Sequence, residues 1–95
     1  MIISQLTIVP MVEKISITNY IKKVIEVISK HNVRFETNAM ATVLETENLD
    51  QLFKIVKDAH MAMINEGVQR VVTELKIDDR RDKNATIDTK LNGIK

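Results

Sequence analysis

"VRFETNAMATVLET", residues 33–46, is the stretch that decides which fold this chain can adopt. It is rich in residues that favour strands, and it is longer than a typical strand of about five or six residues. We divide it at Asn38–Ala39 into a hairpin, with strands over residues 33–37 and 40–46. No strong turn pair such as Asn-Gly marks the division. The hairpin would place two antiparallel strands in the middle of the chain.

A helix is predicted before the hairpin, over "SITNYIKKVIEVISKHN", residues 16–32. Ser16 or Thr18 suits the N-cap position, and Asn32 suits the stop. The apolar residues recur with the helical period and define one face: Ile17, Ile21, Val24, Ile25 and Ile28.

A second helix is predicted after the hairpin, over "NLDQLFKIVKDAHMAMINEG", residues 48–67. Asn48 can cap its first turn, and the Gln51 side chain, at the N3 position, can accept a hydrogen bond from the backbone N–H of the cap residue, as in a capping box. Gly67 can supply the left-handed residue that ends the helix.

Alternating strands are predicted towards the two ends of the chain. "IISQLTIVP", residues 2–10, has no basic leader or small-residue cleavage pattern, so we interpret it as a first strand that Pro10 ends. "VQRVVTELKI", residues 68–77, is the last strand, and a short helix follows over 87–93. The order β-α-β-β-α-β predicts one α+β domain over residues 1–95, a ferredoxin-like sandwich. Its four-stranded antiparallel sheet would carry two helices on one face, with a short C-terminal helix added.

The composition argues against several classes of protein. The chain has no cysteine, which excludes a disulfide scaffold and thiolate chemistry, and we expect a cytoplasmic location. No apolar run approaches the ~18 residues of a membrane span. A net charge of +1 gives no electrostatic case for nucleic acid. The aromatic residues Tyr20, Phe35 and Phe53 do not fall on the bare sheet face, where an RNA-recognition module stacks bases.

Motifs for catalysis or metal binding are also lacking. His31 and His60 form no metal-ligand spacing, and the acidic residues near position 80 do not follow the calcium-loop pattern. No serine has a base placed beside it by spacing, and no glycine-rich phosphate loop precedes either helix. We therefore predict a protein that is not an enzyme and that has no metal and no cofactor.

Hydroxyl groups gather on the side of the sheet that the helices should cover. Ser4, Thr37 and Thr73 fall on this side, and Thr42 can join them. Threonine suits strands and can bond locally, which is the plainer explanation for any one of them. A buried hydroxyl without a partner costs about 1–3 kcal/mol, so several together favour a small polar pocket between sheet and helices.

The other side of the sheet is half apolar. It would show Ile3, Thr7, Val9 and Val72 among Gln5, Glu74 and Lys76. Stacking with another copy would bury these apolar groups, so we predict a homo-oligomer; the alternative is a solvated mixed face.

"KIDDRRDKN", residues 76–84, is the most charged stretch of the chain. Its opposite charges nearly balance, and the arginine fork suits bidentate pairing with carboxylates. We interpret Asp78, Arg80 and Arg81 as part of a salt-bridged corner that docks the tail and contacts a neighbouring copy. A role for Arg80 or Arg81 on a ligand phosphate is the alternative.

Several of these stretches together resemble a known family. "QLTIVP", the hairpin "ETNAMATVLE", the "DAH" of the second helix and "RVVTELKIDDRRDK" are similar to small ferredoxin-like proteins that bind thiamine. The resemblance spans nearly the whole chain. One departure is in the hairpin, where Ala39-Met40-Ala41-Thr42 replaces the Pro-Met-Gly-Thr common in that family.

The resemblance implies non-enzymatic binding of thiamine, or of its hydroxymethylpyrimidine moiety, by dimers or tetramers. Glu45 is a candidate neighbour of the thiazolium, and Met63 either lines the pocket or fills the core. A protein-interaction or regulatory domain without a small ligand is the alternative. The predicted ligand-binding residues are Ser4, Thr37, Asn38, Met40, Thr42 and Thr73.

Overall fold

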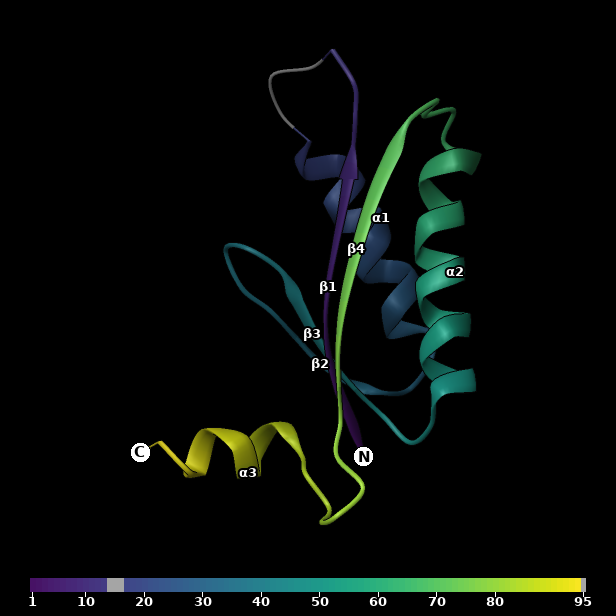
Figure 1. Cartoon of the computed structure of the whole chain (residues 1–95). Coiled ribbons are helices and arrows are strands. Elements are labelled where there is room, and N and C mark those ends of the chain that lie inside the picture. Colours follow the sequence, from purple (N-terminus) through teal and green to yellow (C-terminus); the bar gives the residue numbers. More distant parts are fainter. Residues whose placement is uncertain (14–16, 95) are drawn as a thin grey trace.

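The elements of the computed structural model, which describes residues 1–13 and 17–94, follow the predicted order (Figure 1). Ser16, one of the two predicted N-cap residues, lies outside the described residues. The elements are β1 (Ile2–Pro10), α1 (Thr18–Ser29), β2 (Arg34–Thr37), β3 (Thr42–Thr46), α2 (Leu49–Asn65), β4 (Val71–Asp79) and α3 (Ile87–Asn92).

The four strands form one antiparallel sheet in the order β2-β3-β1-β4. α1 and α2 cover one face of this sheet, and α3 lies on the opposite side from α2 (Figure 1). This is the ferredoxin-like arrangement, so the predicted fold class is confirmed. In the described part of the chain, no helix is long and apolar enough to cross a membrane.

The central hairpin exists, but its second strand begins at Thr42 and not at residue 40. The Asn38 side-chain oxygen accepts hydrogen bonds from the backbone N–H groups of Met40, at 2.8 Å, and Ala41, at 3.0 Å. The Asn38 N–H donates to the Ala41 carbonyl at 2.9 Å. Because Asn38 holds these amides in a four-residue turn, they cannot extend the strand.

The predicted residues set the ends of α2 but not those of α1, whose first helical residue is Thr18. Asn48 Oδ1 accepts from the Gln51 N–H at 2.8 Å, but the Gln51 side chain reaches the Glu47 N–H in place of the Asn48 N–H. Gly67, with φ 89°, follows the C-cap of α2 in left-handed conformation as predicted. α1 ends earlier than predicted, at Ser29 with Lys30 as its C-cap, and Asn32, with φ 55°, lies beyond the helix end. Ile17 occupies the N-cap position of α1 without a side-chain cap.

The core lies between the sheet and the two long helices. Ile2, Leu6 and Ile8 of β1 point into it because alternate residues of a strand face the same side. They meet fully buried side chains from β3 and both helices, which are Leu44, Ile28, Leu52, Ile55 and Met63. Burial of each such side chain contributes roughly 1.5–3 kcal/mol before entropy is counted.

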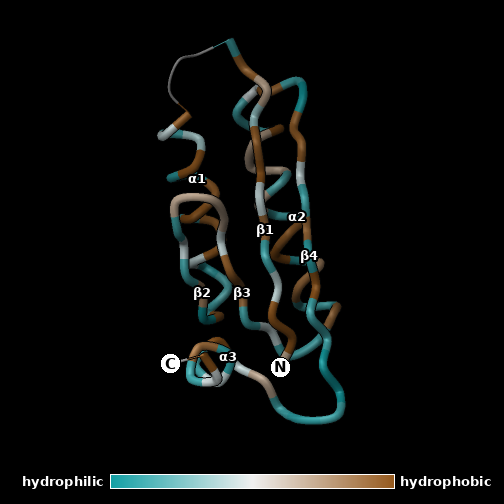
Figure 2. The backbone as a smooth tube through the Cα atoms, turned by 60° about the vertical axis from the view of Figure 1, so that its left-hand side comes forward, coloured by the Kyte–Doolittle hydropathy of each residue, from teal (hydrophilic) through white to brown (hydrophobic). Residues whose placement is uncertain are grey.

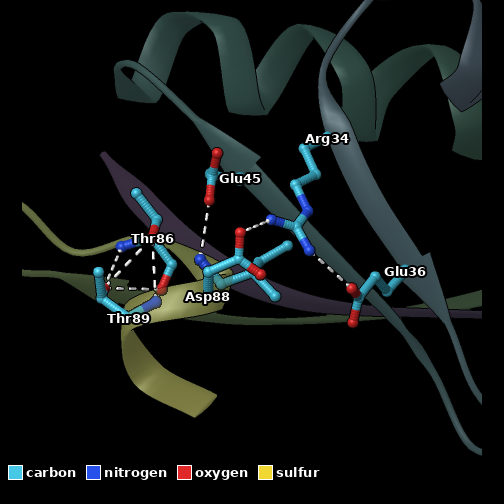
Figure 3. Close-up of polar contacts among 7 residues, drawn as sticks. Arg34, Glu36, Glu45, Thr86, Asp88 and Thr89 are labelled. Carbon is cyan, nitrogen blue, oxygen red and sulfur yellow. Dashed lines mark hydrogen bonds and ion pairs between the residues drawn. The ribbon is translucent and has the colours of Figure 1, made fainter. Parts of the chain in front are cut away.

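α3 docks on the other face of the sheet, along one row of residues that crosses all four strands. Strand pairing aligns Arg34, Glu45, Ile3 and Asp78 in this row. Arg34 pairs with Asp88 of α3, and the Glu45 carboxylate accepts from the Ile87 N–H at 2.8 Å (Figure 3). At the far end Lys90 donates to Asp78 at 2.6 Å. α3 therefore contacts β2, β3 and β4 at once.

This docking corrects one expectation from the sequence. Ile3 was assigned to the bare face, but it is buried, as are Ala85 and Ile87 from the tail. These three residues lie outside the main core cluster. The tail thus shields one end of the face that the two long helices leave uncovered.

We expect Ile87→Ala to lower the free energy of unfolding by about 2 kcal/mol, because Ile87 is only 4% exposed. Leu91→Ala is the matched control, since Leu91 lies on the same helix but is 37% exposed, and its effect should stay under about 1 kcal/mol. Urea unfolding measures both. Equal losses would show that α3 does not dock through Ile87.

Candidate functional site

A cavity of about 240 Å³ lies between the first half of α1, the second half of β1 and the tip of the β2–β3 hairpin. Its walls are mostly apolar and come from β1 and α1: Leu6, Ile8, Ile17, Ile21, Val24 and Ile25. Its other end is formed by the hairpin, through residues 37–42. All the described side chains that line it are uncharged.

The cavity exists because the strands differ in length. Thr42 is the first residue of β3 and pairs with Leu6, so among the described residues no strand pairs with β1 on that side from Thr7 onward. β4 continues to pair with β1 as far as Pro10. Figure 2 shows β1 and β4 rising past the end of the β2–β3 hairpin. α1 covers the resulting gap and closes it into a cavity.

The polar end of the cavity holds four of the six predicted ligand-binding residues. The Thr37 and Thr42 hydroxyl oxygens lie 3.1 Å apart in a hydrogen bond. Asn38 lines the cavity, but its side-chain oxygen Oδ1 already accepts two hydrogen bonds from the turn. Met40 is 84% exposed at the hairpin tip, so it lines the cavity from the outside and does not fill the core.

The other two predicted residues face the helices but lie away from the cavity. Ser4 is buried, with Leu44 and Ile77 as its cross-strand neighbours. The Thr73 hydroxyl bonds to His60 Nδ1 at 2.6 Å. The structure therefore brings together the hydroxyls of the hairpin but not those of Ser4 and Thr73.

Two further candidates are placed elsewhere. Met63 is fully buried in the main core, which matches its core-filling interpretation. Glu45 lies on the opposite face of the sheet, where it accepts from the Ile87 N–H. The expectation that Glu45 sits near a bound thiazolium is wrong for this cavity, because alternation along β3 turns it away from Thr42 and Leu44.

Sequence reasoning missed the apolar wall that α1 gives to the cavity. Ile17, Ile21 and Ile25 were assigned to ordinary packing against the sheet. The signal that could have found the cavity is the unequal length of the expected strands, since residues 2–10 outrun residues 40–46. Beyond the hairpin, a helix that lies over the longer strand has no second strand beneath it to fill the space.

The charged corner after β4 is built from ion pairs within the chain. Arg80 pairs with Asp82 through two hydrogen bonds, and Arg81 pairs with Asp79. The hydrogen bond from Lys90 and its charge lower the pKa of Asp78. Because this pKa is lower in the folded state than in the unfolded chain, the contact of Asp78 with Lys90 contributes to folding stability at pH values above the ordinary carboxyl pKa. The contribution is lost as the pH falls through the lowered pKa of Asp78.

The described side chains of this corner pair with one another and with α3. Among residues 1–13 and 17–94, no three His, Asp or Glu side chains gather as metal ligands would. Arg80 and Arg81 also lie near the N-terminus of α2, where they border a polar hollow with Asn48 and Asp50. The expected contact of this corner with a neighbouring copy stays a prediction.

Comparison with known proteins assigns the family. Residues 4–95 match the family described as thiamine-binding protein. The chain belongs to this family. It is 45% identical to the UPF0045 protein MJ1052 of Methanocaldococcus jannaschii, over 98% of this chain and 91% of the relative. It is 31% identical to the UPF0045 protein YqgV of Bacillus subtilis, over 99% of this chain and 94% of the relative.

Solved structures of family relatives have the same fold. The crystal structure of the M. jannaschii protein superimposes with a TM-score of 0.90, covering 98% of this chain and 94% of that chain. A domain of unknown function from Bacillus cereus, 36% identical, gives 0.85 and covers 95% and 86%. The cavity of this thiamine-binding family member therefore lies in a fold that its relatives share.

Asn38→Ala should destabilise the protein by roughly 1–2 kcal/mol, because two turn amides lose their acceptor. For a domain of this size the loss corresponds to a Tm lower by about 5–10 °C. Asn38→Asp keeps an acceptor oxygen and should stay close to the parent protein. Thermal unfolding by circular dichroism compares the three, and an unchanged Tm for Asn38→Ala would show that the turn does not need this side chain.

Proposed function

We propose that this protein binds thiamine, or its hydroxymethylpyrimidine moiety, without catalysis. The observation that carries the proposal is the cavity between α1, β1 and the hairpin, in a chain of the thiamine-binding family. The proposed ligand-binding residues are the four that line it, namely Thr37, Asn38, Met40 and Thr42. Ser4 and Thr73 lie outside the cavity, so they have no direct contact in this proposal.

The lining suits a flat aromatic ring. An aminopyrimidine needs apolar walls on its two faces and a few donors and acceptors at its edge. Ile21 and Ile25 supply wall from α1, and Leu6 supplies it from the sheet. The paired hydroxyls of Thr37 and Thr42 can each donate or accept, because a hydroxyl has one hydrogen and two lone pairs.

Isothermal titration with thiamine tests the proposal, with Thr42→Val as the diagnostic variant. Losing one hydrogen bond of about 0.5–1.5 kcal/mol should weaken binding roughly 2- to 12-fold. Thr46→Val is the matched control, because Thr46 is buried on the same strand and face but does not line the cavity. Its hydroxyl has no hydrogen-bond partner among the described residues, so the change should leave affinity and stability nearly unaltered.

No heat at high micromolar protein would contradict the proposal. A protein that retains no small molecule in native mass spectrometry, and that co-purifies with a second protein in stable complex, would instead support the interaction-domain alternative. If Thr42→Val and Thr46→Val bind thiamine with equal affinity, the hairpin hydroxyls do not contact the ligand.

We also propose that the open part of the sheet is a contact between copies of this chain. Val9 and Val72 pair across β1 and β4, and they are 41% and 36% exposed on the face that α3 leaves uncovered. Glu74 and Lys76 follow Val72 at alternate positions of β4, on the same face, and carry opposite charges. In a two-fold contact the same patch meets itself, so mixed charges beside an apolar pair can complement one another.

Val72→Lys should shift the protein towards monomer, because it would place an uncompensated ammonium in the apolar centre of the contact. Light scattering measures the mass. Phe53→Lys is the matched control, since Phe53 is an exposed apolar residue on α2, away from this face. A mass unaltered by Val72→Lys, or lowered equally by both variants, would count against this contact.

A further inference from the structure

No described strand pairs with β1 on the β3 side where β1 borders the cavity, and the strand pairing shows which of its backbone groups face this gap. Asn38 and Ala41 are joined by a backbone hydrogen bond, so the next pair, Thr37 and Thr42, is a non-hydrogen-bonded pair of the hairpin. The close approach of the two threonine hydroxyls agrees with this geometry. The N–H and C=O of Thr42 therefore point away from β2 and towards β1.

The same alternation continues along β1. Thr42 pairs with Leu6, so Leu6 directs its N–H and C=O to the β3 side. Ile8, two residues further along β1, also directs its N–H and C=O towards the β3 side, but β3 has ended before this position. Thr7 and Val9 direct theirs towards β4, which pairs with both. Thr7, Ile8 and Val9 all border the cavity, although the side chain of Ile8 points to one face of the sheet and those of Thr7 and Val9 point to the other. Consecutive residues border a cavity in this way when the strand backbone itself lines it.

We propose that the N–H and C=O of Ile8 recognise the edge of a ring that carries a hydrogen-bond acceptor beside a donor. This rests on the proposed function and names the group of the ligand that is read. In extended backbone the N–H and C=O of one residue lie on the same edge. The ring nitrogen and amino group of a 4-aminopyrimidine present the complementary pattern, acceptor beside donor. The ring would take the place that a longer β3 would otherwise fill.

The uncharged lining decides which part of the ligand enters. A cation taken out of water without a partner is costly, and the described side chains around the cavity offer no carboxylate. The neutral aminopyrimidine therefore enters, and a thiazolium stays at the mouth beside the exposed Met40. The ligand class is that of neutral 4-aminopyrimidines, with or without a cationic substituent.

Amide hydrogen exchange followed by NMR tests the role of Ile8. In the free protein the Ile8 amide should exchange faster than those of Thr7 and Val9, which face β4. Saturation with thiamine, or with 4-amino-5-hydroxymethyl-2-methylpyrimidine, should slow the Ile8 amide at least tenfold and move its proton signal downfield. The amides of Thr7 and Val9 are internal controls and should change little.

Calorimetry with oxythiamine tests the reading of the ring edge, because its 4-oxo group reverses the donor and acceptor. We expect its affinity to be at least tenfold below that of thiamine, and the hydroxymethylpyrimidine to bind within about tenfold of thiamine. Heat with thiamine but an unprotected Ile8 amide would overturn this inference alone, as would equal binding of oxythiamine. Absence of heat with all three compounds would overturn the proposed function, and this inference with it.

Discussion

The two hydrogen bonds that the Asn38 side chain accepts from the hairpin turn set the geometry on which the rest of the site depends. They hold residues 38–41 in a turn, so β3 starts at Thr42 and stops pairing with β1 at Leu6. β1 itself cannot stop there, because β4 pairs with it as far as Pro10. The gap beside β1, and the cavity that α1 closes over it, follow from this mismatch. A side chain chosen from the sequence as a ligand group thus serves first to shape the site.

The proposed ligand follows from combining the family of the chain with the shape and lining of the cavity. The proposed ligand has a flat ring with a polar edge, and the described residues of the cavity offer apolar walls, two hydroxyls and a stretch of β1 that pairs with no described strand on the β3 side. Backbone groups are well suited to this task because their direction is fixed by the strand and costs no side-chain entropy on binding. In the proposed binding mode the strand edge keeps its donors and acceptors whichever side chains stand at the hairpin tip, which here include Ala39 and Ala41.

The sequence predicted the elements well because their signals are local. The period-two pattern placed Thr37 and Thr73 on the covered side, where Thr42 joins them, and the helical period placed Val24 and Ile28 on the face that packs in the core. Which hydroxyls lie near one another depends on how far each strand extends past its neighbour, and this is not a local property. Thr73 therefore proved to bond His60, and Ser4 to lie between Leu44 and Ile77, although both face the helices. The burial of Ile3 was likewise out of reach, because it requires α3 to cross the sheet.

α3 is too short to be stable by itself in water, so it exists only while the sheet offers its row of partners. That row takes one residue from each strand, and α3 bonds to three of them, Arg34, Glu45 and Asp78. A slip of any one strand by a single residue would turn its side chains to the other face and remove its contact with the tail. α3 thereby favours one alignment of the strands over the others, because its contacts with β2, β3 and β4 form together only when all the strands are in this register.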